Sequence, residues 1–297
     1  MTARPNFFIV GAPKCGTTAW AEYLRTHPQI GFARQKEPHY FNTDFPDFRW
    51  ARSQADYLSF FEGCEGKTAI GEASVMYLYS SEAAANIARF DPGAKILIFL
   101  RDPVRFLPSY HNQLLLNLDE DIRDFGQAWA LSGERAKALP STCRDAKFLD
   151  YPAAARFAQQ IQRYRAHFPD AQIKILRMEE WKPNPRAAYL DVLEFLGLPD
   201  DGRVDFPVIH KAKHHSSGAV AKLIQRPPGW ALRVAAAVRR VLGLKRLGLS
   251  KLLRRMNTGT GYAKRDEENA ELQDEIRAAL AEDQALLQQI FKERSHG

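Results

Sequence analysis

The sequence predicts an α/β fold with three layers, in which helices flank a central parallel β-sheet. Short apolar runs alternate along the chain with longer stretches of helical periodicity, and a glycine-containing turn joins the first run to a helix. The predicted strands are Phe7–Val10, Thr68–Gly71, Lys95–Leu100 and Gln172–Leu176, and the predicted helices are Thr17–Thr26, Ser81–Phe90, Val104–Leu116 and Ala153–His167. Ligands bind beyond the carboxyl ends of strands in such sheets, so Gly11, Glu72 and Arg101 are expected at one edge.

The turn after the first strand has the composition of an anion site. Residues 11–18 lead from an apolar strand into the first turn of a helix, where unpaired backbone N–H groups and the helix dipole favour negative charge. Lys14 adds a cation, and Thr17 and Thr18 add hydroxyl donors. This segment therefore predicts a site for a phosphate or a chemically similar group.

The same turn differs from a nucleoside-triphosphate loop. Gly11 and Gly16 have the spacing of such a P-loop, but Thr17 stands where its lysine would be, and Lys14 lies two residues before the second glycine. The strand that ends at Leu100 is followed by Arg101, where a nucleotide hydrolase often places an aspartate for its metal. The pattern favours a P-loop-like fold with a metal-free site for anion transfer. A small-molecule or nucleotide kinase stays an alternative.

Three stretches resemble sulfotransferases that use 3′-phosphoadenosine-5′-phosphosulfate (PAPS). Pro13–Thr18 is similar to that family's 5′-phosphosulfate loop, and Arg101 with Ser109 is similar to its 3′-phosphate element. Lys36–Phe41 matches a Lys-Glu-Pro-His motif of the bacterial and Golgi carbohydrate-type members. The resemblance covers residues 6–197 and the final helix. It implies PAPS as donor, adenosine 3′,5′-bisphosphate (PAP) as product, and no metal.

The resemblance also implies which residues bind the donor. Lys14 would stabilise charge on the oxygen that bridges sulfur and phosphorus, and Cys15 would fill the variable place of the loop. The cofactor-binding residues implied in this way are Lys14, Cys15, Gly16, Thr17, Thr18, Arg101 and Ser109, with Lys211 and Lys213 as a basic loop of looser similarity.

A carboxylate near the donor would serve as general base. Sulfuryl transfer requires the acceptor to lose a proton as it attacks sulfur, and relatives with this motif use the residue that matches Glu37. His39 is a rival base, because imidazole titrates near neutrality, and His111 is a weaker one. An ordinary surface pair between Glu37 and Lys36 is the alternative without function.

One position departs from the Golgi heparan-type enzymes, which have a catalytic lysine in a Glu-Lys-Thr-Pro stretch. Here Ala73 takes the place of that lysine, between Glu72 and Ser74, which are still expected to line the site. The departure argues for a different acceptor: a hydroxyl, or less readily an amine, of a carbohydrate, a glycolipid or a secondary metabolite. Loops at 31–60 and 117–150 and the basic segment are expected to form its pocket.

Length and composition allow one domain or two, and we expect a single domain over residues 1–297. The chain is 45% hydrophobic, enough for a large core, and no uncharged apolar run is long enough to span a membrane. No apolar leader core follows the initial Met1. Three cysteines, at positions 15, 64 and 143, have no metal-ligand spacing and fit a reducing cytoplasm. We therefore expect a cytoplasmic, metal-independent enzyme.

Charge is unevenly distributed. Residues 206–265 hold fourteen Lys or Arg and no Asp or Glu, although the net charge of the chain is only +7. The segment is either a solvated cationic face of the core, a surface that attracts the anionic donor or acceptor, or a contact with an anionic membrane. A non-catalytic membrane-binding protein is therefore a further alternative, and no nucleic acid is expected. The chain is predicted to end in an acidic helix over residues 267–291.

Overall fold

A five-stranded parallel sheet forms the centre of the protein. The computed structural model describes residues 3–209, 213–215, 258–260 and 269–295. The strands are β1 (Phe7–Gly11), β2 (Ile30–Phe32), β3 (Ala69–Ala73), β4 (Lys95–Leu100) and β5 (Ile173–Arg177), in the order β2-β3-β1-β4-β5. A separate antiparallel pair joins β6 (Lys213–His215) to β7 (Thr258–Thr260). The predicted α/β class with a central parallel sheet is confirmed.

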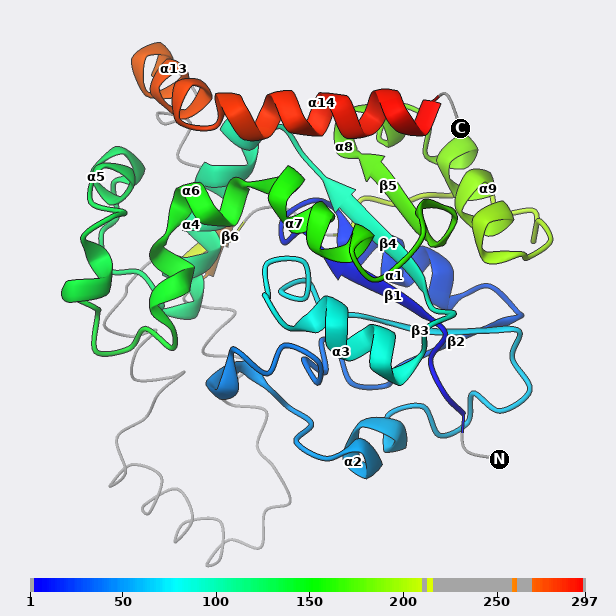
Figure 1. Ribbon diagram of the computed structural model, residues 1–297. Coiled ribbons are helices and arrows are strands. Elements are labelled where there is room, and N and C mark those ends of the chain that lie inside the picture. Colours follow the sequence, from blue (N-terminus) through cyan, green and yellow to red (C-terminus); the bar gives the residue numbers. More distant parts are fainter. Residues whose placement is uncertain (1–2, 210–212, 216–257, 261–268, 296–297) are drawn as a thin grey trace, which may run out of the picture.

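Helices cover both faces of this sheet. Figure 1 shows α3 and α7 in front of the strands and α1 behind them. The helices are α1 (Thr17–Arg25), α2 (Gln54–Ser59), α3 (Ala83–Phe90), α4 (Pro103–Asn117), α5 (Phe125–Ala130), α6 (Tyr151–Ala155), α7 (Phe157–Arg165), α8 (Met178–Trp181), α9 (Pro185–Leu196), α13 (Ala270–Ala279) and α14 (Ala281–Ser295). The sheet is therefore buried on both sides, as parallel sheets usually are.

The central strands are the apolar runs that the sequence shows. Every residue of β1 is buried, and so is every residue of β4 except Lys95. Phe7 lies opposite Gly71 of β3, and a Cβ atom at Gly71 would approach the Phe7 ring to 2.3 Å. Glycine is therefore needed where the aromatic side chain crosses the neighbouring strand. Gly71 thus permits the register in which Phe7 lies opposite it.

Strand β2 was not expected. Its three residues are too few for a periodic pattern, and Gly31 in the middle has no side chain to signal burial. The strand forms because it pairs with β3 at the edge of the sheet, where Cys64 packs against Gly31 with no room for a Cβ atom. Tertiary contact, and not local propensity, produces this element.

Two predicted helices are each divided in two. The prediction of one helix over Ala153–His167 is wrong, because Arg156 leaves the helical region (ψ 69°) between α6 and α7. The carboxylate of Asp283, on α14, accepts hydrogen bonds from the N–H groups of Ala158 and Gln159 and so begins α7. The predicted final helix over 267–291 likewise consists of α13 and α14, which meet at Leu280.

Candidate active site

The loop between β1 and α1 has the geometry of an anion site. Gly16 has a left-handed backbone (φ +86°), and a Cβ atom there would lie 2.5 Å from the Trp181 ring. Only glycine fits this position, so α1 begins sharply at Thr17 and its first amides face the loop. Lys14 also has a left-handed backbone, with a φ of 62°. The loop predicted from the sequence is therefore formed.

A cleft of about 1300 Å³ opens beside this loop. It joins the loop to the Lys36–Phe41 motif and to the Arg101–Ser109 element that the sequence predicts as parts of the site. Among its lining residues are Lys14, Gly16, Thr17, Thr18, Glu37, His39, Arg101 and Ser109. Residues separated by almost one hundred positions therefore meet at the carboxyl ends of the strands, as the topology predicts.

Lys14 projects into this cleft and is restrained there. Its Nζ donates a hydrogen bond to Oε1 of Gln113, on α4, at 3.2 Å. Burial lowers the pKa of Lys14, and the positive charges of Arg101 and Lys36 lower it further. Three cations that converge in one place are unfavourable without an anion, so this electrostatic environment suits an anionic ligand. Gln113 lies one helical turn after Ser109, and that spacing is the signal by which the sequence would have shown it.

Arg101 and Ser109 line the same cleft as the loop. Arg101 directly follows β4 and lines the cleft. Ser109 is buried on the first half of α4. The neighbouring Asp102 caps α4 by accepting hydrogen bonds from the N–H groups of Val104 and Arg105, so its carboxylate is already engaged. Arg105 is exposed and does not line the cleft, so of these two arginines only Arg101 faces a ligand there.

Glu37 and His39 meet at the edge of the cleft. His39 Nε2 lies 3.3 Å from Oε2 of Glu37, and Lys36 Nζ lies 3.6 Å from Oε1 of the same carboxylate. The Glu37 side chain is 26% exposed, whereas that of His39 is 2% exposed. Glu37 is therefore the group that a ligand would reach first, and His39 lies behind it. The ion pair between Glu37 and Lys36, expected as the alternative without function, is also present, and both of its residues line the cleft.

The surroundings of Glu37 keep it ionised. Burial alone would raise the pKa of its carboxyl, but the hydrogen bond and charge of His39, with Lys36, lower the pKa below its usual range. His111 lies elsewhere: it is buried, it does not line the cleft, and its Nε2 lies 2.8 Å from the carbonyl oxygen of Ile122. Of the three proposed bases, Glu37 and His39 therefore share the site, and His111 does not.

Glu72 and Ser74 do not line the cleft, contrary to expectation. Alternation along β3 and the residues after it turns Ala73 and Val75 toward the site and buries Glu72 and Ser74 on the other side. Burial raises the pKa of Glu72 to about 7, although its hydrogen bonds with Ser74, Tyr57 and Tyr77 oppose that shift. These two residues therefore belong to the layer that supports the site.

The remaining predicted residues have mixed outcomes. The Cys15 side chain is fully buried, its thiol contacts the Pro13 carbonyl oxygen at 3.4 Å, and burial raises its pKa strongly. The thiol does not face the cleft, so only the Cys15 backbone is placed for a ligand.

The predicted basic loop is described only in part. Lys211 lies outside the described residues. Lys213 is described as part of β6, opposite Thr260. Most of the basic segment 206–265 also lies outside the described residues.

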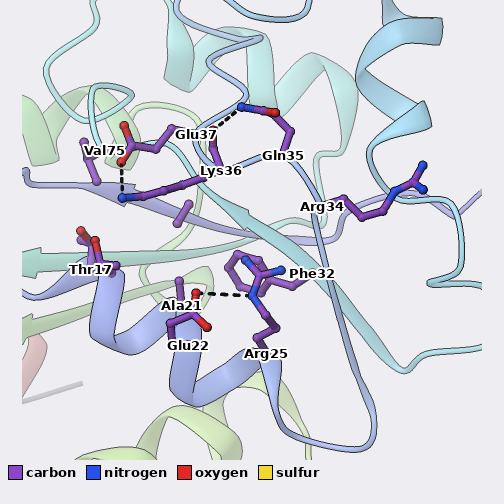
Figure 2. A pocket seen from close by; sticks show the side chains of 12 residues that line it. Thr17, Ala21, Glu22, Arg25, Phe32, Arg34, Gln35, Lys36, Glu37 and Val75 are labelled. Carbon is purple, nitrogen blue, oxygen red and sulfur yellow. Dashed lines mark hydrogen bonds and ion pairs between the residues drawn. The ribbon is translucent and has the colours of Figure 1, made fainter. Parts of the chain in front are cut away.

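A smaller hollow of about 280 Å³ adjoins the cleft on the other side of Glu37. Figure 2 shows that side chains of α1 and of the segment after β2 surround it. Arg25 is held there by Glu22 at 3.6 Å and by the Ala33 carbonyl oxygen at 3.1 Å. Thr17 and Glu37 border both spaces, so a ligand in either one would reach the proposed base.

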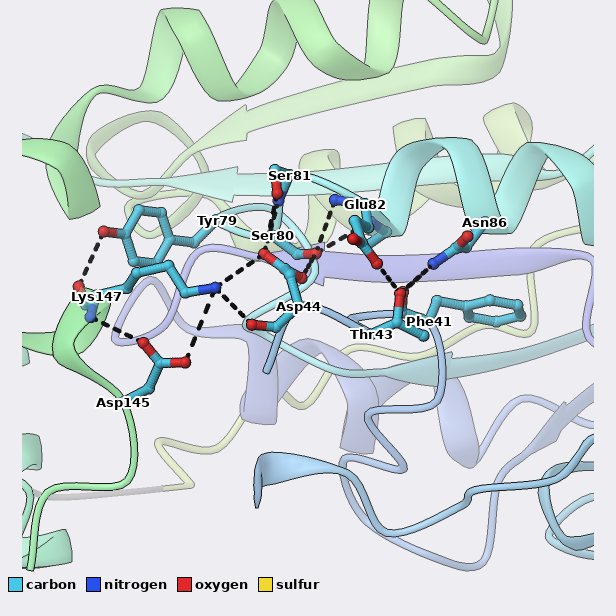
Figure 3. Close-up of polar contacts among 11 residues, drawn as sticks. Phe41, Thr43, Asp44, Tyr79, Ser80, Ser81, Glu82, Asn86, Asp145 and Lys147 are labelled. Carbon is cyan, nitrogen blue, oxygen red and sulfur yellow. Dashed lines mark hydrogen bonds and ion pairs between the residues drawn. The ribbon is translucent and has the colours of Figure 1, made fainter. Parts of the chain in front are cut away.

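A polar cluster fixes the chain that continues from Glu37 toward the far wall of the cleft (Figure 3). Asp44 bonds to the hydroxyl of Ser80, to the N–H and hydroxyl of Ser81, and to Lys147 Nζ. Burial tends to raise the pKa of Asp44, but these partners lower it below its usual range.

The far wall of the cleft contains Asp47, Phe48, Arg49, Trp50, Asp119, Arg144 and Phe148. These residues come from the two loops expected to form the acceptor pocket.

The described residues contain neither a cluster of metal-ligating side chains nor a helix of membrane-spanning character. Within these ranges no three His, Cys, Asp or Glu side chains gather as a metal site would require. No helix in the described part of the chain is both long and apolar enough to cross a membrane.

The chain matches a family model. The model described as "Sulfotransferase domain" covers residues 4–217. Among solved structures, a sulfotransferase from Alicyclobacillus acidocaldarius shares 30% sequence identity, with a TM-score of 0.61 over 84% of this chain and 99% of that one.

Curated relatives match a part of their own length. A membrane-associated sulfotransferase, kil1, from Dictyostelium discoideum is 36% identical over 109 residues, which is 36% of this chain and 22% of that protein. A mouse heparan sulfate glucosamine 3-O-sulfotransferase, 3B1, is 27% identical over 202 residues, 65% of this chain and 46% of that protein. The matched part of this chain thus spans less than half the length of either relative.

Proposed function

Because this chain belongs to the sulfotransferase family, we propose that it transfers a sulfuryl group from PAPS to a hydroxyl group of a carbohydrate. One observation carries the proposal. A single cleft joins the anion loop, the Arg101–Ser109 pair and the carboxylate of Glu37. Transfer needs these three parts together: a donor site, a second phosphate site and a base.

The residues present fit a donor with two anionic ends. Lys14, Thr17 and Thr18 would hold the phosphosulfate end, and Arg101 with Ser109 would hold the 3′-phosphate. Arg101 lines the cleft, and burial together with the positive charges of Arg101 and Lys36 lowers the pKa of Lys14. Both features fit a site completed by an anion. When bound, PAPS supplies the sulfuryl group, which leaves the bridging oxygen and joins the acceptor oxygen.

Glu37 would accept the proton of the acceptor hydroxyl. Its low pKa keeps the carboxylate ionised at neutral pH, and its partial exposure lets a ligand approach. His39 holds one carboxylate oxygen of Glu37 and so orients it. Lys14 would offset the negative charge that develops as PAP departs. This assignment makes Glu37 the base and His39 its positioning partner.

The far wall of the cleft suits a saccharide. Trp50 is 70% exposed although it lines the cleft, and an exposed indole offers a flat apolar face to a sugar ring. Arg144 stacks on Phe48 at 4.4 Å and bonds to Asp119, which presents an ordered polar surface beside it. The name of the mouse relative specifies a glucosamine acceptor for that protein. The acceptor of this chain would differ, since Ala73 replaces the lysine of the heparan-type enzymes.

Calorimetry of nucleotide binding tests the donor. We expect PAP to bind without magnesium, and Lys14→Ala and Arg101→Ala to weaken it. Preference for ATP with magnesium would instead support the kinase alternative, and binding of neither nucleotide would contradict both. A PAPS-dependent assay with a panel of oligosaccharides, glycolipids and phenolic metabolites then tests the acceptor. Transfer only to phenols would contradict the carbohydrate assignment.

Two further expectations stay proposals. We propose a cytoplasmic location, which fractionation of cells would test. Contact of the basic segment 206–265 with an anionic membrane is tested by co-sedimentation with phosphatidylserine vesicles at two salt concentrations. Binding that disappears at high salt supports that contact. Absence of binding at low salt contradicts it.

A further inference from the structure

Glu72 is a buried carboxyl beneath the segment that holds Glu37. Its side chain has no exposed surface. Oε1 accepts hydrogen bonds from the hydroxyls of Tyr57 and Tyr77, both at 2.9 Å, and Oε2 accepts one from Ser74 at 2.5 Å. An acidic side chain is costly to bury and is retained only where its partners are well placed. Three hydroxyl donors provide that here.

Two of the three hydroxyls also accept hydrogen bonds from backbone N–H groups of residues 39–41. Ser74 Oγ accepts a hydrogen bond from the N–H of His39 at 3.0 Å. The Tyr77 hydroxyl accepts one from the N–H of Tyr40 at 2.8 Å and one from that of Phe41 at 3.3 Å. Each hydroxyl thus donates to Glu72 and accepts from the backbone. Because Ser74 and Tyr77 donate their hydroxyl hydrogens to Glu72 in hydrogen bonds, their oxygen lone pairs are oriented toward the N–H groups of residues 39–41.

The segment held in this way has an unfavourable backbone. Glu37 (φ 51°) and His39 (φ 50°) both adopt the left-handed conformation that residues with a side chain avoid. Such residues persist only where their surroundings determine them. The other described backbone hydrogen bonds to residues 37–40 come from Trp50 and Ala51, farther along the same segment, and reach Pro38. Ser74 and Tyr77 therefore connect this backbone to the end of β3.

We propose that Glu72 is a positioning residue that acts through Ser74 and Tyr77. It fixes the backbone at 39–41 and thereby holds the Glu37 carboxylate where the acceptor hydroxyl must lose its proton. The inference rests on the proposed function for its catalytic consequence. The mechanical part, a buried carboxyl that orders the segment, stands on the hydrogen bonds alone.

Tyr77→Phe and Tyr57→Phe are a matched pair of variants. Each removes one buried hydroxyl that donates to the same oxygen of Glu72, so each leaves that carboxyl equally short of a donor. Only the Tyr77 hydroxyl also accepts from the backbone of 40–41. The Tyr57 ring stacks on Tyr40 at 4.6 Å, and phenylalanine retains that contact. The comparison therefore isolates the link to the segment.

We expect Tyr77→Phe to lower kcat at least tenfold with PAP affinity changed less than twofold, and Tyr57→Phe to lower kcat less than twofold. Ser74→Ala should resemble Tyr77→Phe, because it removes the partner of the His39 N–H. Equal losses in the two tyrosine variants would overturn the proposal, and so would an unchanged kcat in Tyr77→Phe. Urea unfolding of each variant identifies any that fails to fold.

Hydrogen–deuterium exchange separates this inference from the proposed function. The amides of residues 39–41 should exchange at least tenfold faster in Tyr77→Phe and Ser74→Ala than in wild type or Tyr57→Phe. That result supports the positioning role even if the wild type transfers no sulfuryl group. Unchanged exchange in both variants would overturn the positioning role, whatever the activity of the wild type.

Discussion

The two sides of the cleft are built in different ways. On the donor side, Lys14, Thr17 and Arg101 lie within a few residues of a buried strand, and strand ends and helix starts determine their places. On the base side, Glu37 and His39 lie in a segment without regular structure, held by side chains from β3 and the residues after it. The donor side depends on local backbone geometry, whereas the base side depends on long-range hydrogen bonds.

The difference has a chemical reason. Binding of a phosphate needs backbone N–H groups and cations, which a strand, a glycine turn and a helix supply together. Proton removal needs one carboxylate in one position relative to the donor, and no single element of secondary structure supplies that. The protein obtains it by holding two left-handed residues with a buried network. Substitutions on the donor side should therefore weaken nucleotide binding, whereas substitutions on the base side should lower kcat.

The largest expected effect is on the base side. Glu37→Gln should lower kcat by about 10² to 10⁴, because the amide cannot accept the proton, while PAP affinity stays the same. Calorimetry and steady-state assays measure both quantities. Glu65→Gln, an exposed residue outside the cleft, is the control. A larger loss in His39→Gln than in Glu37→Gln would reverse their roles and make the histidine the base.

The buried carboxyl of Glu72 should make stability depend on pH. Its pKa is raised from 4.5 to about 7, so the folded protein holds this proton more tightly than the unfolded chain does. Stability is therefore lost as the pH rises from below 4.5 through 7, by about 3 kcal/mol for this group.

Urea unfolding of wild type and Glu72→Gln at pH 5 and pH 8 tests that dependence. The glutamine cannot ionise, so the stability of wild type relative to the variant should fall between the two pH values. Tyr57, Tyr77, Ser74 and Glu37 are the groups that influence Glu72, and all of them remain in the variant. Parallel pH profiles of the two proteins would show that Glu72 does not titrate in this range.

On the donor side, Arg101→Ala should weaken PAP binding by roughly tenfold to a hundredfold, the range for one charged hydrogen-bonding group. Arg105→Ala is a matched control, since this arginine lies four residues farther along the chain but outside the cleft lining. We expect less than a threefold change there. Similar losses in both variants would indicate general attraction by positive charge instead of a defined phosphate site.

The smallest expected effect concerns the acceptor. Trp50→Ala should raise KM for a saccharide acceptor about threefold to tenfold, because it removes one stacking surface, and should leave PAP affinity unchanged. Leu190→Ala removes another exposed apolar side chain, on α9 and away from the cleft, as control. An unchanged KM in Trp50→Ala would exclude the indole from acceptor binding.

The contrast between the two sides also explains what the sequence could predict. Strand β4 was predicted with the bounds it has, and the anion loop was found, because apolar runs and glycine turns are local signals. Glu37 was found only through resemblance to a known family. The left-handed backbone at 37 and 39 has no local signal, since neither residue is a glycine.

The sequence predicts only part of the buried layer that supports the site. Glu72 and Ser74 are two residues apart, and alternation along a strand places them on one face, opposite Ala73. Nothing in the sequence indicates which face is buried beneath the segment 37–41. The break between α6 and α7 was likewise hidden, because the residue that caps α7 lies about 125 positions later in the chain.

That cap has a consequence for how the protein is made on the ribosome. Asp283 starts α7, Glu293 pairs with Arg165, and Arg294 bonds to the carbonyl oxygen of Ile173 in β5. Until α14 has left the exit tunnel, the nascent chain holds α7 without its cap and β5 without this neighbour. We therefore expect α7, in the helix layer in front of the sheet, to become protease-resistant late in translation, after the anion loop has already formed.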